Sequence, residues 1–240
     1  MSDPSTEARD LTGAFPVTAV PDVPYVIGIA RDLGGLHAVP RDHAVRAAGQ
    51  AGDDSPWPYV GAECGLAVIV ARKWGEFRRG NEHLATHRVC PRCAWVVALD
   101  QDRTDEELAA LAPTPTEETA YRRLGADPTL LLRICRVILD QRRQEKDYDA
   151  DSPRWAQLLG YICAHQPEML VSEDCAEGGC DHGDEVECLT ASFTVACSAC
   201  SLQAGSWAGE WQGQYERILS APCSVLLAMA TEFDVAEVPA

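Results

Sequence analysis

The chain has 240 residues and a formal net charge of −17. An acidic excess of this size repels polyphosphate and argues against general nucleic-acid binding, although a local basic patch can override it. Gly and Pro are abundant enough to favour many loops and short elements over one large sheet.

The N-terminal residues lack the basic and apolar regions of a secretory signal. No apolar run approaches the roughly 20 residues that span a bilayer. We therefore expect a cytoplasmic protein that does not associate with membranes. In that compartment the 11 cysteines, which are clustered and odd in number, indicate metal binding or redox chemistry rather than a disulfide framework.

The first part of the chain is expected to form a β-rich module. Residues 1–22 are polar and predict a mobile tail, and residues 23–100 form the module itself. Residues 49–58 are expected to be a loop, because they are rich in Gly, Asp and Pro. The apolar, β-branched segments that we expect to be strands, the first two as a hairpin, are residues 25–30, 36–39, 66–71 and 95–99.

Helices are expected in the middle of the chain, residues 101–166. Thr104 and Thr114 each begin a capping box, while Asp127-Pro128 and Ser152-Pro153 are also helix starts. Residues 167–240 return to short strands, with a hairpin over residues 187–196 and a last helix after Pro222. The predicted fold class is α+β, with two small β-rich, zinc-ribbon-like modules flanking a helical segment.

The first cysteine group contains Cys90-Pro91-Arg92-Cys93, a spacing that lets two thiolates bind one zinc ion from a tight turn. Cys64 is the other cysteine nearby, and the Gly65 that follows suits a tight turn. The fourth ligand should be a histidine. We favour His37, which lies in a predicted strand, and keep the more local His87 as the alternative.

Three short motifs occur in a recognisable order along the chain: His37, then Cys64-Gly65, then Val89-Cys90-Pro91-Arg92-Cys93. In this order the chain resembles small zinc-ribbon-like proteins from phages and mobile elements of actinobacteria. The resemblance covers about a third of the chain and departs from that pattern in the long insertion between Cys64 and Cys90. It implies a small zinc-ribbon-like unit and no particular activity.

A second cysteine group lies near the C-terminus, so we expect about two zinc ions per chain. The favoured ligands are Cys175, Cys180, Cys197 and Cys200; the alternative set replaces the first two with His182 and Cys188. Surrounding acidic residues are interpreted as a solvated loop. The cysteines on apolar helix faces, expected to be core residues, are Cys135 and Cys223. The residues considered as auxiliary ligands but not included are Cys163 and His165.

These motifs favour a zinc-stabilised binding or regulatory protein that contacts a protein or nucleic-acid partner. A protein partner is preferred, but residues 72–92 carry six Lys or Arg against two Glu, which allows weak local nucleic-acid binding. The alternatives are a metalloenzyme with an open zinc position and a cysteine-based redox sensor. We find no phosphate-binding loop, nucleophile elbow or His-Glu-x-x-His pair, which lowers the enzyme hypothesis and predicts no catalytic residue.

Overall fold

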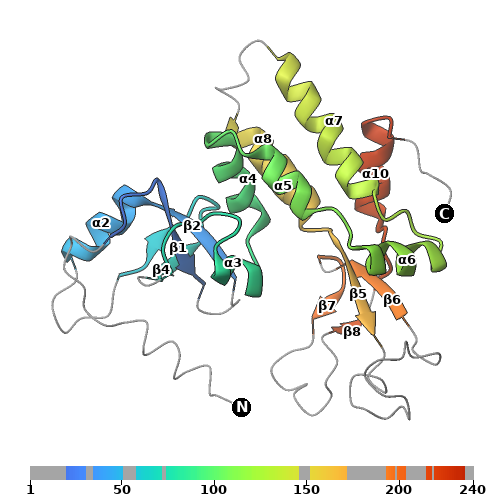
Figure 1. Ribbon diagram of the computed structural model, residues 1–240, viewed down its shortest axis with the longest axis horizontal. Coiled ribbons are helices and arrows are strands. Elements are labelled where there is room, and N and C mark those ends of the chain that lie inside the picture. Colours follow the sequence, from blue (N-terminus) through green and yellow to red (C-terminus); the bar gives the residue numbers. More distant parts are fainter. Residues whose placement is uncertain are drawn as a thin grey trace. The chain divides into compact units, whose positions relative to one another are not determined.

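The computed structural model describes residues 20–30, 35–50, 58–71, 74–145, 152–171, 193–197, 199–203, 215–217 and 219–235. The chain divides into two compact units. Unit 1 contains residues 1–107 and 149–160, and unit 2 contains residues 108–148 and 161–240. Helices and strands occur in both (Figure 1), as in an α+β protein. Among the described residues, no helix is both long and apolar enough to cross a membrane.

Unit 1 is built on an antiparallel sheet with strand order β2-β1-β4-β3. The expected first hairpin is confirmed: Val26 pairs with Val39, and Gly28 pairs with His37. Its predicted turn, residues 31–34, lies outside the described residues. The strands are β1 (Tyr25–Ile29), β2 (Leu36–Pro40), β3 (Val60–Gly61) and β4 (Ala67–Val70).

The strand predicted over residues 95–99 is wrong, because these residues lie in a helix, α4 (Pro91–Asp100). Val96 and Val97 suggested a strand, but short apolar runs do not distinguish a strand from a buried helix. Pro91 at the first helical position fixes a helix start. The helix then buries most of its side chains, Trp95 among them.

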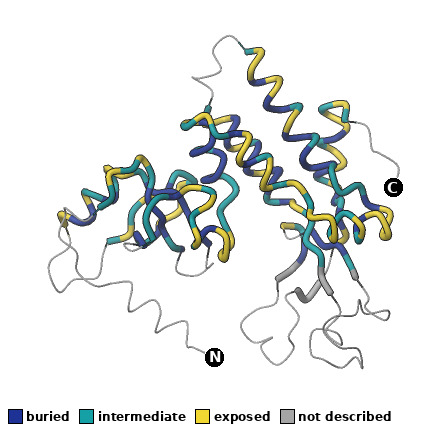
Figure 2. The backbone as a smooth tube through the Cα atoms, viewed as in Figure 1, coloured by how far each residue is buried: buried dark blue, intermediate teal, exposed yellow. Residues whose placement is uncertain are grey.

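The other regular elements described in unit 1 are helices (Figure 1). One of them, α2 (Arg41–Gln50), was not predicted and takes up the start of the expected loop, of which residues 51–57 lie outside the described part. The sheet, α2 and α4 share one core (Figure 2). The other helices with residues in unit 1 are α3 (Glu82–Thr86), α5 (Thr104–Ala110) and α8 (Ser152–Cys163).

Unit 2 combines helices with two small two-stranded sheets. Of the two predicted capping boxes, the one at Thr114 is confirmed: the Glu117 amide donates to Thr114 Oγ1, and the Glu117 carboxylate accepts from the Thr114 amide. Thr104 is instead the first residue of α5 and not the residue that precedes it. The helices are α6 (Pro115–Arg123), α7 (Leu130–Gln144) and α10 (Ser224–Glu232). The strands are β5 (Pro167–Val171), β6 (Phe193–Cys197), β7 (Leu202–Gln203) and β8 (Tyr215–Arg217).

The described partner of β6 is β5, in an antiparallel pair that sets Pro167 opposite Cys197. The first strand of the hairpin predicted here, residues 187–190, lies outside the described residues. An isolated bridge also joins Ala196 to Ser220. The end of β6 is thus held close to both the segment after α8 and the segment before α10.

Candidate metal centres

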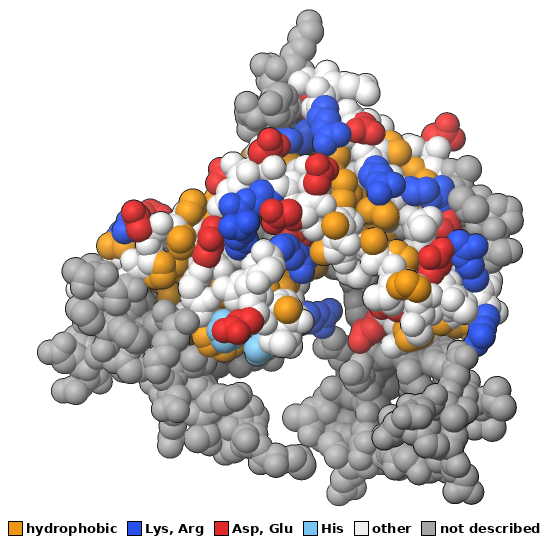
Figure 3. Space-filling view, in the orientation of Figure 1, with side chains coloured by type: hydrophobic (Ala, Val, Ile, Leu, Met, Phe, Trp, Pro, Cys, Tyr) orange, Lys and Arg blue, Asp and Glu red, His pale blue; other side chains and the backbone are white. Residues whose placement is uncertain are grey.

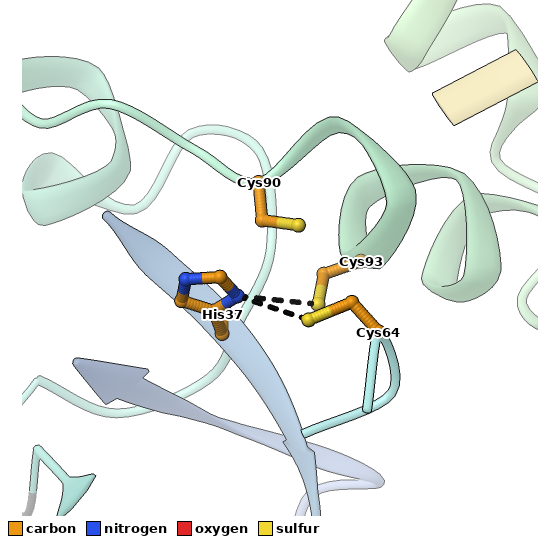
Figure 4. Close-up of side chains that lie close together, drawn as sticks. All are labelled: His37, Cys64, Cys90 and Cys93. Atoms are coloured by element: carbon orange, nitrogen blue, oxygen red, sulfur yellow. Dashed lines mark hydrogen bonds between the residues drawn. The ribbon is translucent and has the colours of Figure 1, made fainter. Parts of the chain in front are cut away.

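The first candidate metal centre lies in unit 1 (Figure 4). Its four side chains come from one strand of the sheet, one turn between strands and the start of one helix. His37 comes from β2, Cys64 from the turn between β3 and β4, and Cys90 and Cys93 from the start of α4. His37 Nδ1 lies 3.2 Å from Cys64 Sγ and 3.8 Å from Cys93 Sγ. All four ligand atoms lie within 4.8 Å of one another. The structure therefore brings together the four residues favoured from the sequence, which we call the first quartet.

Local backbone contacts place these side chains. The Cys64 turn is closed by the Gly65 amide, which donates to Ala62 O at 2.8 Å, and Gly65 has a φ of 85° that favours glycine. The Cys90 amide donates to Leu36 O at 2.9 Å, which fixes the start of α4 beside the strand that carries His37. The quartet is thus determined by backbone pairing and does not depend on its side chains alone.

The residues of the first quartet are buried or half-buried, and they shift one another's pKa values. His37 is 7% exposed and Cys93 is fully buried. Burial alone lowers the pKa of His37, but hydrogen bonds and charge from Cys64 and Cys90 outweigh it and raise the pKa to about 9. Hydrogen bonds with Cys90 and Cys93 lower the pKa of Cys64, whereas those with Cys64 and Cys90, together with burial, raise that of Cys93. A bound cation would favour the deprotonated form of these thiols.

The second candidate metal centre lies in unit 2 and consists of His165, Cys197, Cys200 and Cys223, which we call the second quartet. His165 Nδ1 lies 3.4 Å from Cys197 Sγ, 3.3 Å from Cys200 Sγ and 3.5 Å from Cys223 Sγ. Burial lowers the pKa of His165 and therefore favours the neutral imidazole that binds metals. Burial also raises the pKa of Cys197 to about 12.

Backbone hydrogen bonds assemble this quartet as well. The Cys200 and Ser201 amides donate to Cys197 O at 3.2 and 2.9 Å, which closes the tight turn between the two cysteines. The Cys197 amide donates to Leu219 O at 2.8 Å, so the chain that leads into α10 runs beside β6. Cys223 then follows as the residue that precedes the first turn of α10.

Hydrogen bonding does not explain why three sulfurs converge on one ring nitrogen. A nitrogen of neutral imidazole either donates one proton or accepts one hydrogen bond. Zinc bonds of ~2.3 Å to sulfur and ~2.0 Å to nitrogen, at tetrahedral angles, separate nitrogen from sulfur by about 3.5 Å. The distances in the second quartet, 3.3–3.5 Å, lie close to that value. Both quartets are therefore arranged as groups that could hold a metal ion.

In each quartet one cysteine lies at the N-terminal end of a helix. Cys90 and Cys223 each occupy the N-cap of a helix, α4 and α10, and neither makes a side-chain capping hydrogen bond. The positive end of a helix stabilises a thiolate placed there. Pro91 follows Cys90, whereas Pro222 precedes Cys223, so no shared spacing in the sequence identifies Cys223 as a possible ligand.

The second quartet contains two of the four residues that the sequence favours as ligands near the C-terminus. Cys197 and Cys200 are brought together, while Cys175, Cys180, His182 and Cys188 lie outside the described residues. His165 was considered as an auxiliary ligand and left out, and Cys223 was interpreted as a core residue. The structure buries both residues and places them in the quartet.

No family model, curated protein or solved structure matches the chain. Function is therefore inferred from the geometry of the two quartets and from the charges around them.

The basic segment over residues 72–92 is partly engaged in internal contacts. Arg79 donates two hydrogen bonds of 2.9 Å to Glu107, and Arg92 donates to Cys64 O at 3.3 Å. Arg78 and Arg88 are exposed, and residues 72–73 lie outside the described part. Basic and acidic side chains alternate on the face shown in Figure 3, rather than separating into a single basic surface.

Proposed function

We propose that each quartet binds one zinc ion and that the chain is a binding or regulatory protein whose two units these ions stabilise. The observation that carries the proposal is the convergence of three cysteine sulfurs on His165 Nδ1 at 3.3–3.5 Å. The first quartet has the same composition, three cysteines and one histidine. From the resemblance stated above, we propose that the first site belongs to a small zinc-ribbon-like module. Because the second site has the same donor set, we propose a module of this kind there as well.

Zinc suits this donor set better than the other common metals. Thiolate and imidazole ligands in a tetrahedral arrangement select zinc, whereas most iron–sulfur clusters use four cysteines and Mg²⁺ and Ca²⁺ prefer oxygen. Zinc with three thiolates carries a net charge of −1. The N-termini of α4 and α10 face that charge through Cys90 and Cys223, which reduces the cost of burying it.

Four protein ligands favour a structural role over a catalytic one. Catalytic zinc sites keep a position for water or substrate, while structural sites are closed by four side chains. The residues that would close both sites are buried or half-buried. A binding protein is therefore favoured over a metalloenzyme.

A redox sensor is the second candidate, and one observation favours it. Cys90 and Cys93 open α4, and a Cys-x-x-Cys pair at a helix start is also the arrangement of redox dithiols. Against this, His37 and Cys64 contribute their side chains to the same cluster. A dithiol does not require either of them, but a zinc ion requires both.

We propose a protein rather than a nucleic acid as the main partner. The net charge of −17 opposes nucleic acid, and the ion pair of Arg79 with Glu107 reduces the local basic excess. We expect this binding to take place in the cytoplasm, where thiols stay reduced.

Cobalt substitution of the full chain tests the zinc sites. Elemental analysis of the purified protein should give two zinc ions per chain. After exchange with Co²⁺, the visible absorption of tetrahedral, thiolate-bound cobalt should appear and stay unchanged when azide is added, since four protein ligands leave azide no position. An azide-dependent spectrum would support the metalloenzyme, and an absence of zinc and cobalt binding would overturn the proposal.

A further inference from the structure

The structure describes eight cysteines, none of them in a disulfide. Six belong to the two quartets, which leaves Cys135 and Cys163. These two lie on different helices, α7 and α8, and their Sγ atoms are 3.7 Å apart. Both are buried, with exposed fractions of 0% and 3%. The two described cysteines outside the quartets thus have neighbouring sulfur atoms.

We propose that Cys135 and Cys163 form a redox-active dithiol, which a peroxide oxidises to a disulfide without involving either quartet. A disulfide bond needs a sulfur separation of ~2.05 Å, so the two sulfurs must approach by about 1.7 Å. Rotation about the side-chain bond between Cα and Cβ moves each sulfur by distances of this order. No metal ligand has to be displaced for the bond to form.

The reaction balances with one peroxide. The first thiol loses its proton, and its sulfur attacks a peroxide oxygen; the O–O bond breaks, and a sulfenic acid and water result. The second sulfur attacks that sulfenic sulfur, the S–O bond breaks and a second water leaves. Two thiols are oxidised by two electrons in total, and hydrogen peroxide is reduced to two waters.

Burial determines which oxidants react and how fast. A buried pair admits hydrogen peroxide more readily than a bulky reagent such as oxidised glutathione. The hydrogen bond with Cys163, together with burial, raises the pKa of the Cys135 thiol, so little thiolate is present at neutral pH. The oxidation is therefore slow, and it accelerates as the pH rises.

The disulfide would connect two consecutive helices, α7 and α8. It closes a loop of 28 residues, and such a cross-link stabilises the folded state by restricting the unfolded chain. It also fixes the end of α8, two residues before His165 of the second quartet. The oxidised protein should therefore melt at a higher temperature than the reduced protein.

Peptide mapping of the zinc-loaded full chain tests this inference. The protein is treated with hydrogen peroxide, alkylated while unfolded, digested and analysed by mass spectrometry. The expected product is a peptide pair joined through Cys135 and Cys163, formed while two zinc ions remain bound and reversed by a reductant. Cys135→Ser and Cys163→Ser should each lack it.

Two results would overturn the inference. One is oxidation of the quartet cysteines, with zinc release, before any link between Cys135 and Cys163 forms. The other is alkylation of both thiols after prolonged exposure to peroxide. The mapping uses the unaltered protein, so it gives an answer even if the serine variants do not fold, and a protein found to lack zinc could still form the link.

Discussion

The imidazole Nδ1 of His165 lies 3.3 Å from the Sγ of Cys200, although 35 residues separate them in the sequence. The same nitrogen lies 3.4 Å from Cys197 Sγ and 3.5 Å from Cys223 Sγ. One side chain thus joins the end of α8 to the turn after β6 and to the start of α10. The assembly of this quartet therefore depends on the tertiary structure of unit 2.

Removal of one thiol from the second quartet should remove one metal ion. Cys223→Ala leaves three ligands, so we expect the zinc content to fall from two ions per chain to one. Cys135→Ala is the matched control, because it also deletes a buried thiol but one outside both quartets. Elemental analysis of both variants measures the result. Two zinc ions in Cys223→Ala would exclude this residue as a ligand.

Loss of a ligand from the first quartet should unfold unit 1. Zinc binding supplies folding free energy on the order of 10 kcal/mol in small zinc domains, so Cys93→Ser should abolish protection of β1 and β2. Amide hydrogen exchange measures the effect in those strands. Chelation of zinc from the unaltered protein should reproduce it. A variant that keeps both its protection and its metal would contradict the assignment.

Gly160 should not tolerate a side chain. A Cβ atom at this position of α8 would lie 2.6 Å from the Cα of Arg92, so Gly160→Ala should lower the free energy of unfolding by about 1–3 kcal/mol. Gly49→Ala is the matched control, since nothing lies within 4 Å of a Cβ there. It should raise helix stability by about 0.5–1 kcal/mol. Thermal melting of the zinc-loaded variants compares the two, and equal melting temperatures would argue against the close packing.

Zinc affinity at the second quartet should fall with decreasing pH. The Cys197 thiol, with a pKa of about 12, is protonated at neutral pH in the metal-free protein and must lose that proton to bind zinc. The bound state then holds fewer protons, so acid favours release, by about tenfold per pH unit for each displaced proton. Competition with a chromophoric chelator at pH 6.5, 7.5 and 8.5 measures the slope, and Cys223→Ala, which should lack this site, gives the contribution of the first quartet. An affinity independent of pH would contradict thiolate ligation.

Nucleic-acid binding should be weak and detectable only at low salt. A mobility-shift titration with Arg78→Glu/Arg88→Glu tests the exposed basic residues, and we expect any shift to disappear while the melting temperature stays unchanged. Arg79→Glu is an unsuitable probe, because it leaves the buried Glu107 without its partner and should destabilise the protein by about 1–3 kcal/mol. An unaltered shift in the double variant would place the binding elsewhere. Absence of any shift at low salt would leave a protein partner as the better hypothesis.

The sequence determined the local features of this protein. The hairpin of β1 and β2, the capping box at Thr114 and the buried stripe of α7 follow from short-range patterns. The residues of the first quartet could also be named, because a Cys-x-x-Cys pair narrows the choice to one nearby cysteine and a few histidines. The helix at α4 was missed because a short apolar run carries no periodicity that separates a strand from a buried helix.

Only the tertiary structure decided the second quartet. His165 carries no motif of its own, and Cys223 cannot be distinguished from an apolar core residue by its neighbours in the sequence. Both join the quartet because β6 pairs with β5 on one side and the Cys197 amide donates to Leu219 O on the other. Those hydrogen bonds bring the ends of α8 and α10 to the same point. Backbone pairing between distant segments thus brings His165 and Cys223 to the two cysteines of the Cys-x-x-Cys pair. No local sequence pattern encodes that pairing.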